Sequence, residues 1–248
     1  NTTLDSIIGV KNIDYIQLIF IDTPGINFLK NNSISQKKIK SSLWQGIDQS
    51  NIILYVIDSK SFDLNYLLNH LNILMTIRKK IIIVFNKIDL INKKTLLPFV
   101  NKINSHTKID SFFFVSAKKN IGINKLLNSL KNLSINSEWM YKHNEITNKD
   151  EIFISNECTR NAILKYLHKE LPYNIKVKNI DFKYLKNGDI KIKQQLLIED
   201  LRYKKIILGK KGEKIKSIRE SSQIQIKKIL EKKIHLYLEI MKFNAKKS

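Results

Sequence analysis

The chain has 248 residues, a formal net charge of +22 at pH 7 and one cysteine, and it contains no apolar run long enough to span a bilayer. This length allows two domains of ordinary size. The lone Cys158 excludes an intrachain disulfide, which suits a reducing compartment, and we expect it to be an ordinary small helix residue. Because the first residues show no secretory pattern, the sequence predicts a cytoplasmic protein.

The positive charge predicts a polyanionic partner, of which nucleic acid is the usual one. A genome rich in A and T would also encode many lysines, so the total charge alone does not decide the matter. Residues 202–233, however, hold 12 basic and 3 acidic side chains, a net charge of +9 within one short segment. This local density favours a nucleic-acid surface near the end of the chain.

The first half of the chain alternates short apolar runs with polar stretches of helical character. We expect helices over residues 35–50, 63–79, 95–106 and 122–132. Buried strands are expected at Ile16–Ile21, Ile52–Ile57, Ile81–Phe85 and Phe112–Val115. Strands that alternate with helices predict an α/β domain with a mostly parallel sheet, which we place at residues 1–134.

The first expected strand, Ile16–Ile21, runs directly into the segment Asp22–Gly25, of sequence DTPG. A carboxylate such as Asp22 at the end of a buried strand is suited to hold Mg²⁺ through water, and the backbone N–H of Gly25 is open to a terminal phosphate. The alternative is a plain Pro-Gly turn at the end of a strand.

The run Ile81–Phe85 is followed by the segment Asn86–Asp89, of sequence NKID. The Asp89 carboxylate is able to accept both the N1–H and the exocyclic amine of guanine, whereas adenine presents the wrong donors and acceptors. Asn86 would brace the neighbouring loop, and the stem of Lys87 would stack over the base. In a chain so rich in Asn and Lys, this short motif alone also arises by chance.

The run Phe112–Val115 is followed by Ser116, Ala117 and Lys118, whose backbone N–H groups are suited to the guanine carbonyl while Ser116 braces the loop. Taken alone, this segment is equally a small-residue turn before a helix. Three motifs that each follow a strand, however, converge on the crevice where open α/β sheets bind ligands.

With these three motifs in this order and at these separations, the chain resembles the translation-factor-like small GTPases. The resemblance implies GTP or GDP and Mg²⁺ as cofactors and hydrolysis of GTP. It implies that Thr3 ligates Mg²⁺, that Asp22 holds it through water, and that Gly25 serves the γ-phosphate. The base would be bound by Asn86, Lys87, Asp89, Ser116, Ala117 and Lys118.

The phosphate-cradling motif GxxxxGK[ST] does not occur in these 248 residues, and residue 1 falls where the family has its first switch. We therefore expect an amino-terminally truncated piece that is inactive by itself, while the intact protein is a GTPase. The resemblance also implies slow intrinsic hydrolysis, because Ile26 stands where many GTPases have a water-orienting Gln. The alternative hypothesis is an RNA-binding module with a degenerate G domain that does not bind nucleotide.

Residues 135–149 lose the alternating pattern and are expected to form a linker. The second half, residues 150–248, then follows a different order, α-β-β-α-α-β, which predicts a separate α+β domain. Its helix is expected at 150–169, its first two strands at 173–184 and 189–199 around an Asn187-Gly188 turn, and its last strand at 233–241. A short helix, a glycine-containing loop and a helix ending near residue 230 lie between them.

The loop of the second domain follows the pattern IIGxxGxxI. Two glycines allow a tight turn to approach a sugar–phosphate backbone, the lysines add positive charge, and the apolar residues would line a groove for unstacked bases. The alternative is a simple helix–turn–helix with a solvated lysine face. With the surrounding element order, the segment resembles a type II KH domain, and its expected RNA-binding residues are Ile207, Leu208, Gly209, Lys210, Lys211, Gly212, Lys214 and Ile215.

A GTPase domain joined to a KH domain resembles the Era family of ribosome-assembly GTPases, as do the segments 170–173 (ELPY), 209–216 and 235–239. The resemblance implies binding to the 3′ region of 16S rRNA, assistance in maturation of the 30S subunit, and a monomer in the cytoplasm. Peripheral association with the inner face of the cell membrane is a further expectation. A third hypothesis is that the basic patch mainly serves a membrane surface.

Overall fold

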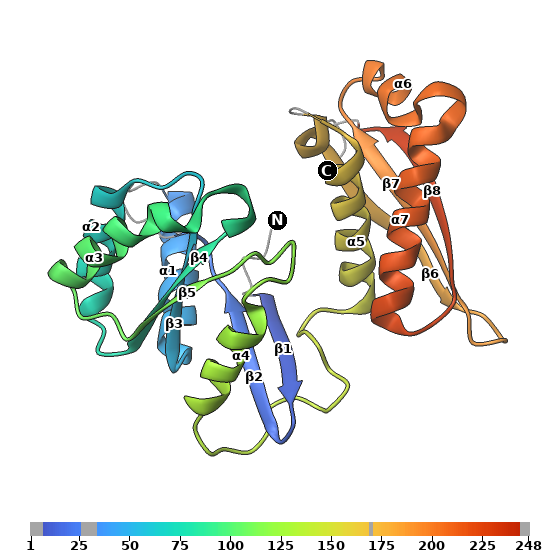
Figure 1. Cartoon of the computed structure of the whole chain (residues 1–248). Helices are drawn as coiled ribbons and strands as arrows, with labels where there is room; N and C mark the ends of the chain where they lie inside the picture. The colour runs from blue at the N-terminus through green and yellow to red at the C-terminus, as the bar shows by residue number, and fades with distance from the viewer. Residues whose placement is uncertain (1–6, 26–33, 169–170, 244–248) are drawn as a thin grey trace. The chain divides into compact units, whose positions relative to one another are not determined.

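The computed structural model describes residues 7–25, 34–168 and 171–243, with only the backbone described for 34–39. It divides the chain into two compact units, Asn1–Asn148 and Lys149–Ser248, both shown in Figure 1. The predictions made for Thr3 and Ile26 lie outside the described residues.

The first unit contains a parallel sheet of order β3-β4-β5 and a separate antiparallel pair, β1-β2. The parallel strands are β3 (Ile52–Asp58), β4 (Lys80–Asn86) and β5 (Ser111–Phe114), and the pair is β1 (Ile7–Ile13) with β2 (Ile16–Asp22). The helices are α1 (Ile34–Gln49), α2 (Leu64–Met75), α3 (Leu97–His106) and α4 (Ile123–Asn132). The predicted α/β class with a parallel sheet is confirmed.

Strand β4 is buried on both faces, as its unbroken apolar run predicts. Ile81, Ile83 and Phe85 pack with residues of α1, α2 and α3 on one face. Ile82 and Val84 pack on the other face with residues of α4 and with apolar side chains of β2. The carboxyl end of this strand is therefore held from both sides, and the segment that follows it begins from a rigid support.

Two features of the first unit differ from the sequence-based expectation. Strand β1 was not predicted, and residues 135–149, expected as a linker, lie against the β1–β2 pair. Gln17 accepts hydrogen bonds from the backbone N–H groups of Met140 and Tyr141 at 3.1 and 2.9 Å, and the Val10 N–H donates to the Ile146 carbonyl at 2.8 Å. Most of this segment is thereby fastened to the first unit.

The second unit has the predicted order α-β-β-α-α-β. Its helices are α5 (Glu151–Tyr166), α6 (Arg202–Leu208) and α7 (Glu213–Leu230), and its strands are β6 (Ile175–Tyr184), β7 (Ile190–Ile198) and β8 (Ile234–Lys242). The sheet order is β6-β7-β8, with β6 antiparallel and β8 parallel to the central β7. The predicted hairpin turn is present, with Gly188 at φ 83°.

Helices α5 and α7 lie side by side over one face of this sheet (Figure 1). Alternate residues of β7 face them, and Ile190, Ile192, Leu196 and Ile198 are fully buried. Between these apolar residues, Gln194 is also buried, and its amide bonds to Ser155 and Thr159 of α5. In the described part of the chain, no helix is both long and apolar enough to cross a membrane.

Candidate functional site

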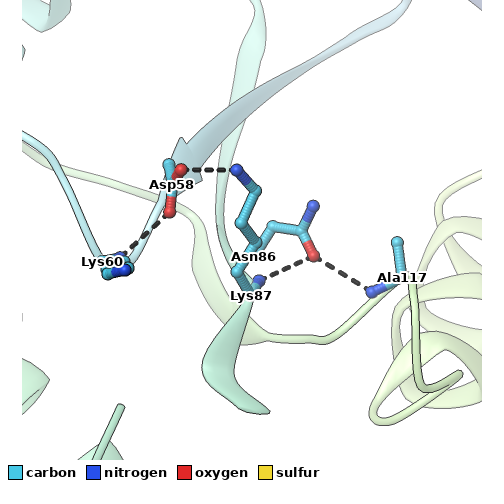
Figure 2. Close-up of polar contacts among 5 residues, drawn as sticks. All are labelled: Asp58, Lys60, Asn86, Lys87 and Ala117. Carbon is cyan, nitrogen blue, oxygen red and sulfur yellow. Dashed lines mark hydrogen bonds and ion pairs between the residues drawn. The ribbon is translucent and has the colours of Figure 1, made fainter. Parts of the chain in front are cut away.

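The ends of strands β4 and β5 are joined by the side chain of Asn86. Its Oδ1 accepts the backbone N–H of Lys87 at 2.8 Å and that of Ala117 at 3.0 Å (Figure 2). Lys87 takes a left-handed backbone conformation, with φ 62° and ψ 32°, which turns the chain sharply out of the strand. The bracing role expected for Asn86 therefore has a direct geometric basis.

The loop that follows β5 is also fixed by its own hydrogen bonds. Ser116 is fully buried, and its Oγ accepts the backbone N–H of Lys119 at 3.1 Å. Ser116 and Ile121 exchange both backbone hydrogen bonds, at 3.0 and 3.1 Å. Gly122, with φ 72°, then starts α4, where a Cβ would clash with the carbonyl of Phe114. The loop therefore does not have to be ordered by a ligand.

Asp89 lies beside this loop in a short 3₁₀ turn, Ile88–Leu90. Ile88 is buried, and its N–H donates to the Val115 carbonyl at 3.2 Å, which holds the turn against the end of β5. Asp89 itself is exposed, and no residue that the structure describes bonds to its carboxylate. Both carboxylate oxygens are thus available to accept hydrogen bonds from a ligand.

Lys87 is held by Asp58, a residue that the sequence motifs did not single out. The Lys87 Nζ lies 2.6 Å from Asp58 Oδ2, and Asp58 Oδ1 accepts the backbone N–H of Lys60 at 3.0 Å (Figure 2). The hydrogen bond from Lys87 lowers the pKa of the Asp58 carboxyl, with a smaller contribution from the Lys60 N–H. A signal was present in the sequence, because Asp58, like Asp22, directly follows an apolar run.

One detail differs from the expected role of the segment Ser116–Lys118. The Ala117 N–H already donates to Asn86, so this group braces the loop. Lys118 is exposed, and no described residue accepts its backbone N–H. Of the backbone donors in this segment, the N–H of Lys118 is the one available to a base.

Asp22 and Gly25 belong to the first of the three motifs, the DTPG segment at the end of β2. Both are exposed. The buried Gly46 of α1 packs against this exit, since a Cβ there would lie 2.7 Å from the Thr23 methyl. No hydrogen bond or ion pair among the described residues joins Asp22 to the cluster around Asn86. The structure therefore brings together the base-binding candidates but does not by itself join the DTPG segment to them.

The turn between α6 and α7 requires a glycine at position 209 and favours one at position 212. Gly209 has φ 72° and ψ −176°, a conformation that side chains do not tolerate, and a Cβ there would lie 2.6 Å from the Cβ of Lys214. Lys211 and Gly212 are left-handed, with φ 50° and φ 78°. Lys210 and Lys211 are exposed on this turn, and α7 starts directly after it, so lysine charge and a helix amino terminus coincide.

The structure corrects the expectation for Ile207. Its side chain is fully buried in the core of the second unit, with Ile218 and Leu196, and is not on a surface that would contact a base. The reason is helical periodicity, because Ile207 lies on the inner face of α6. Leu208 and Ile215, in contrast, are partly exposed at the edge of the same core, where contact with a ligand is sterically possible.

Two family models match the chain. One, described as a 50S ribosome-binding GTPase, matches residues 1–87, and one described as a KH domain matches residues 170–245. The GTPase Era of Ehrlichia canis is 33% identical over 234 residues, 93% of this chain and 77% of that protein. The GTPase Era of Rickettsia prowazekii is 34% identical over 242 residues, 96% of this chain and 79% of that protein.

Two solved structures are similar over 98% of the chain and 83% of their own length. The first is Era in complex with MgGDPNP and nucleotides 1506–1542 of 16S ribosomal RNA, at 26% identity and a TM-score of 0.78. The second is a single-residue variant of Aquifex aeolicus Era bound to GDP and AlF4⁻, at 25% identity and a TM-score of 0.79.

Proposed function

The chain belongs to the Era family of GTPases, and on that basis we propose that its first part binds GTP or GDP with Mg²⁺ and its second part binds ribosomal RNA. The proposed domains are a GTPase domain at residues 1–134 and a KH RNA-binding domain at 150–248, joined by a linker at 135–149, most of which is fastened to the first unit. The proposed nucleotide binding rests on one observation. Asn86 accepts a hydrogen bond from the Ala117 N–H, and beside this contact Asp89 is exposed and its carboxylate is not bonded to any described residue.

This geometry supports the proposed recognition of guanine. The Asp89 carboxylate accepts the N1–H and the exocyclic amine of guanine, two donors that adenine does not present together. The stem of Lys87, anchored through its Nζ to Asp58, lies along the face of the base. The Lys118 N–H donates to the guanine carbonyl, while Asn86, Ala117 and Ser116 hold the loop.

Mg²⁺ and the phosphates are assigned to the DTPG segment and to Thr3. Asp22 is an exposed carboxylate without a described partner, which fits a residue that holds a hydrated Mg²⁺. Thr3 supplies a hydroxyl ligand, and the Gly25 N–H donates to the γ-phosphate. When bound, the metal ion neutralises the charge that develops on the phosphate oxygens.

The RNA half of the proposal rests on the glycine turn. Exposed Lys210 and Lys211 meet phosphates, Gly209 and Gly212 let the backbone approach closely, and Lys214, Leu208 and Ile215 flank the bound nucleotides. We propose the 3′ region of 16S rRNA as the target, since a similar structure holds nucleotides 1506–1542 of that RNA. A role in 30S maturation, as a cytoplasmic monomer with peripheral membrane contact, completes the proposal.

The RNA assignment is tested with the double variant Lys210→Asp and Lys211→Asp. Both side chains are exposed, and Asp tolerates the left-handed backbone of Lys211, so the fold is expected to persist. Affinity for the 16S rRNA fragment 1506–1542 should fall at least about tenfold in a filter-binding titration.

The matched control is Lys227→Asp with Lys228→Asp, which makes the same charge change in the last turn of α7. This control should bind the RNA much more tightly than the turn variant does. Equal affinities for the two double variants would reject the glycine turn as the RNA site.

A further inference from the structure

The sheet of the second unit has a face that its helices leave open. Side chains alternate along β7, so Ile192 and Leu196 face α5 and α7, whereas Lys191, Lys193 and Gln195 point to the opposite side. No described helix of the second unit covers that side. We call it the lysine face and define it by the residues Lys176, Lys178, Lys183, Lys191, Lys193 and Tyr237.

The register of the strands sets these charges side by side. Lys183 of β6 lies directly opposite Lys191 of β7, and on the other side of Lys191 lies His235 of β8, whose ring is hydrogen-bonded to Asp189 at 2.7 Å. Like charges directly opposite each other destabilise a sheet. Folding stability therefore does not explain this row, which instead creates a positive field on the open side.

The face also carries acidic groups, but they leave most of its lysines unpaired. Asp181 forms an ion pair with Lys183 at 3.4 Å, and Glu239 accepts a hydrogen bond from Gln195 at 3.0 Å. No ion pair with Lys191 or Lys193 is found in the described part of the chain. Asp189, at the start of β7, is bonded to His235 at 2.7 Å. Five lysines against the three carboxylates Asp181, Asp189 and Glu239 leave a net positive surface.

An exposed aromatic ring lies within this positive surface. Tyr237 of β8 is paired in register with Lys193, and 54% of its surface is exposed. An acidic protein partner would be attracted by the lysines alone, whereas a ring among unpaired lysines fits the stacking of an unpaired base between contacts to phosphates. This combination favours single-stranded RNA as the occupant.

We propose that the lysine face is a second RNA-contact surface, which takes a single-stranded segment of the RNA whose other nucleotides lie at the Gly209–Gly212 turn. The inference rests on the proposed RNA-binding function. The turn follows α6, whose Ile207 packs with Leu196 on the helix side of the sheet, whereas the lysine face lies on the other side. We therefore expect a short oligonucleotide seated at the turn not to contact the lysine face. A longer RNA contacts both sites.

The experiment compares a single-stranded RNA of about six nucleotides, enough for one KH groove, with the 16S rRNA fragment 1506–1542. The test variant is Lys191→Gln with Lys193→Gln, and the matched control is Lys227→Gln with Lys228→Gln. The test variant should bind the long RNA at least about fivefold more weakly, and its salt-dependence slope should fall by about 1.4, which corresponds to two lost phosphate contacts. Its affinity for the short RNA should be unchanged.

Tyr237 is tested in the same assay. Tyr237→Ala should weaken binding of the long RNA at least about fivefold, because a stacked base is lost, while Tyr237→Phe should bind like the parent chain. Circular dichroism checks that each variant remains folded.

The proposal is overturned if the lysine-face variants bind the long RNA like the parent chain, or if the Lys227 and Lys228 control weakens binding equally. The first result would leave the face to an acidic protein partner, and the second would show an effect of bulk charge. Failure of the proposed function gives a different result, since the parent chain would then bind neither RNA, or Lys210→Asp with Lys211→Asp would leave binding of both unchanged.

Discussion

At the scale of single residues, Asp58 is the side chain that links the sheet to the candidate base site. It holds the Lys87 Nζ at 2.6 Å and is itself held by the Lys60 N–H at 3.0 Å. Asp58→Asn keeps the shape but removes the charge. An exposed ion pair contributes about 0.2–1 kcal/mol, so the GDP affinity of the intact protein should fall by a factor of about 1.4 to 5, as measured by titration with a fluorescent GDP analogue.

The matched control for this variant is Asp14→Asn, which removes the ion pair between Asp14 and Lys131 near the β1–β2 turn. It should leave GDP affinity unchanged. If the two variants weaken GDP binding equally, or neither does, then Asp58 does not position Lys87 for the base.

Residue roles were predictable only where a motif fixes the backbone. The bracing by Asn86 follows from its place at a strand end, and the structure supplies the partner, the Ala117 N–H, that spacing alone does not identify. Ile207 was assigned wrongly, because the glycine pattern does not say which face of the preceding helix is buried. Asp58 lies outside every motif, so only the parallel register of β3 and β4 places it beside Lys87.

At the scale of elements, Lys79 fastens the end of α1 to the start of β4. Its Nζ donates to the carbonyls of Ile47, Asp48 and Ser50 at 2.5, 2.8 and 2.5 Å. These carbonyls lie at the carboxyl end of a helix, where the last C=O groups have no backbone N–H partner within the helix. Lys79→Met keeps the apolar stem but removes this charged donor from all three carbonyls, of which, among the described residues, only that of Ile47 keeps other partners, the N–H and Oγ of Ser50. The free energy of unfolding should therefore fall by about 1–3 kcal/mol in urea denaturation.

Lys80→Met is the control for this change, since Lys80 is the exposed neighbour at the start of β4. Its effect on the free energy of unfolding should stay within about 0.5 kcal/mol. Equal effects of the two substitutions would contradict the capping role.

The strands that the sequence predicts well are those with strong local signals. The run Ile81–Phe85 is apolar throughout and is bounded by polar residues, so its strand was evident. Strand β1 was missed because Gly9 and Asn12 interrupt its apolar pattern and its turn, at Asp14 and Tyr15, has no glycine. The contacts of residues 140–141 with Gln17 join positions more than 120 apart in the sequence, which no local pattern predicts.

At the scale of the whole molecule, the chain combines two units with separate cores and separate chemistry. The first places an unengaged carboxylate at the end of a sheet, and the second places lysines on a glycine turn and on an open sheet face. The total charge of +22 was an incomplete guide, because it does not distinguish the lysines that are paired, such as Lys87, from those that are available to a polyanion. Distinguishing them required the register and the ion pairs.

The central claim is that Asp89 selects guanine, and it is tested by Asp89→Asn in the intact protein with GDP and xanthosine diphosphate as competing ligands. The amide of Asn offers a donor where the carboxylate offered an acceptor, and xanthine has a carbonyl where guanine has its amine. GDP affinity should fall at least about 100-fold, while xanthosine diphosphate should become the tighter ligand. A variant that still prefers GDP as strongly as the parent protein would contradict the account.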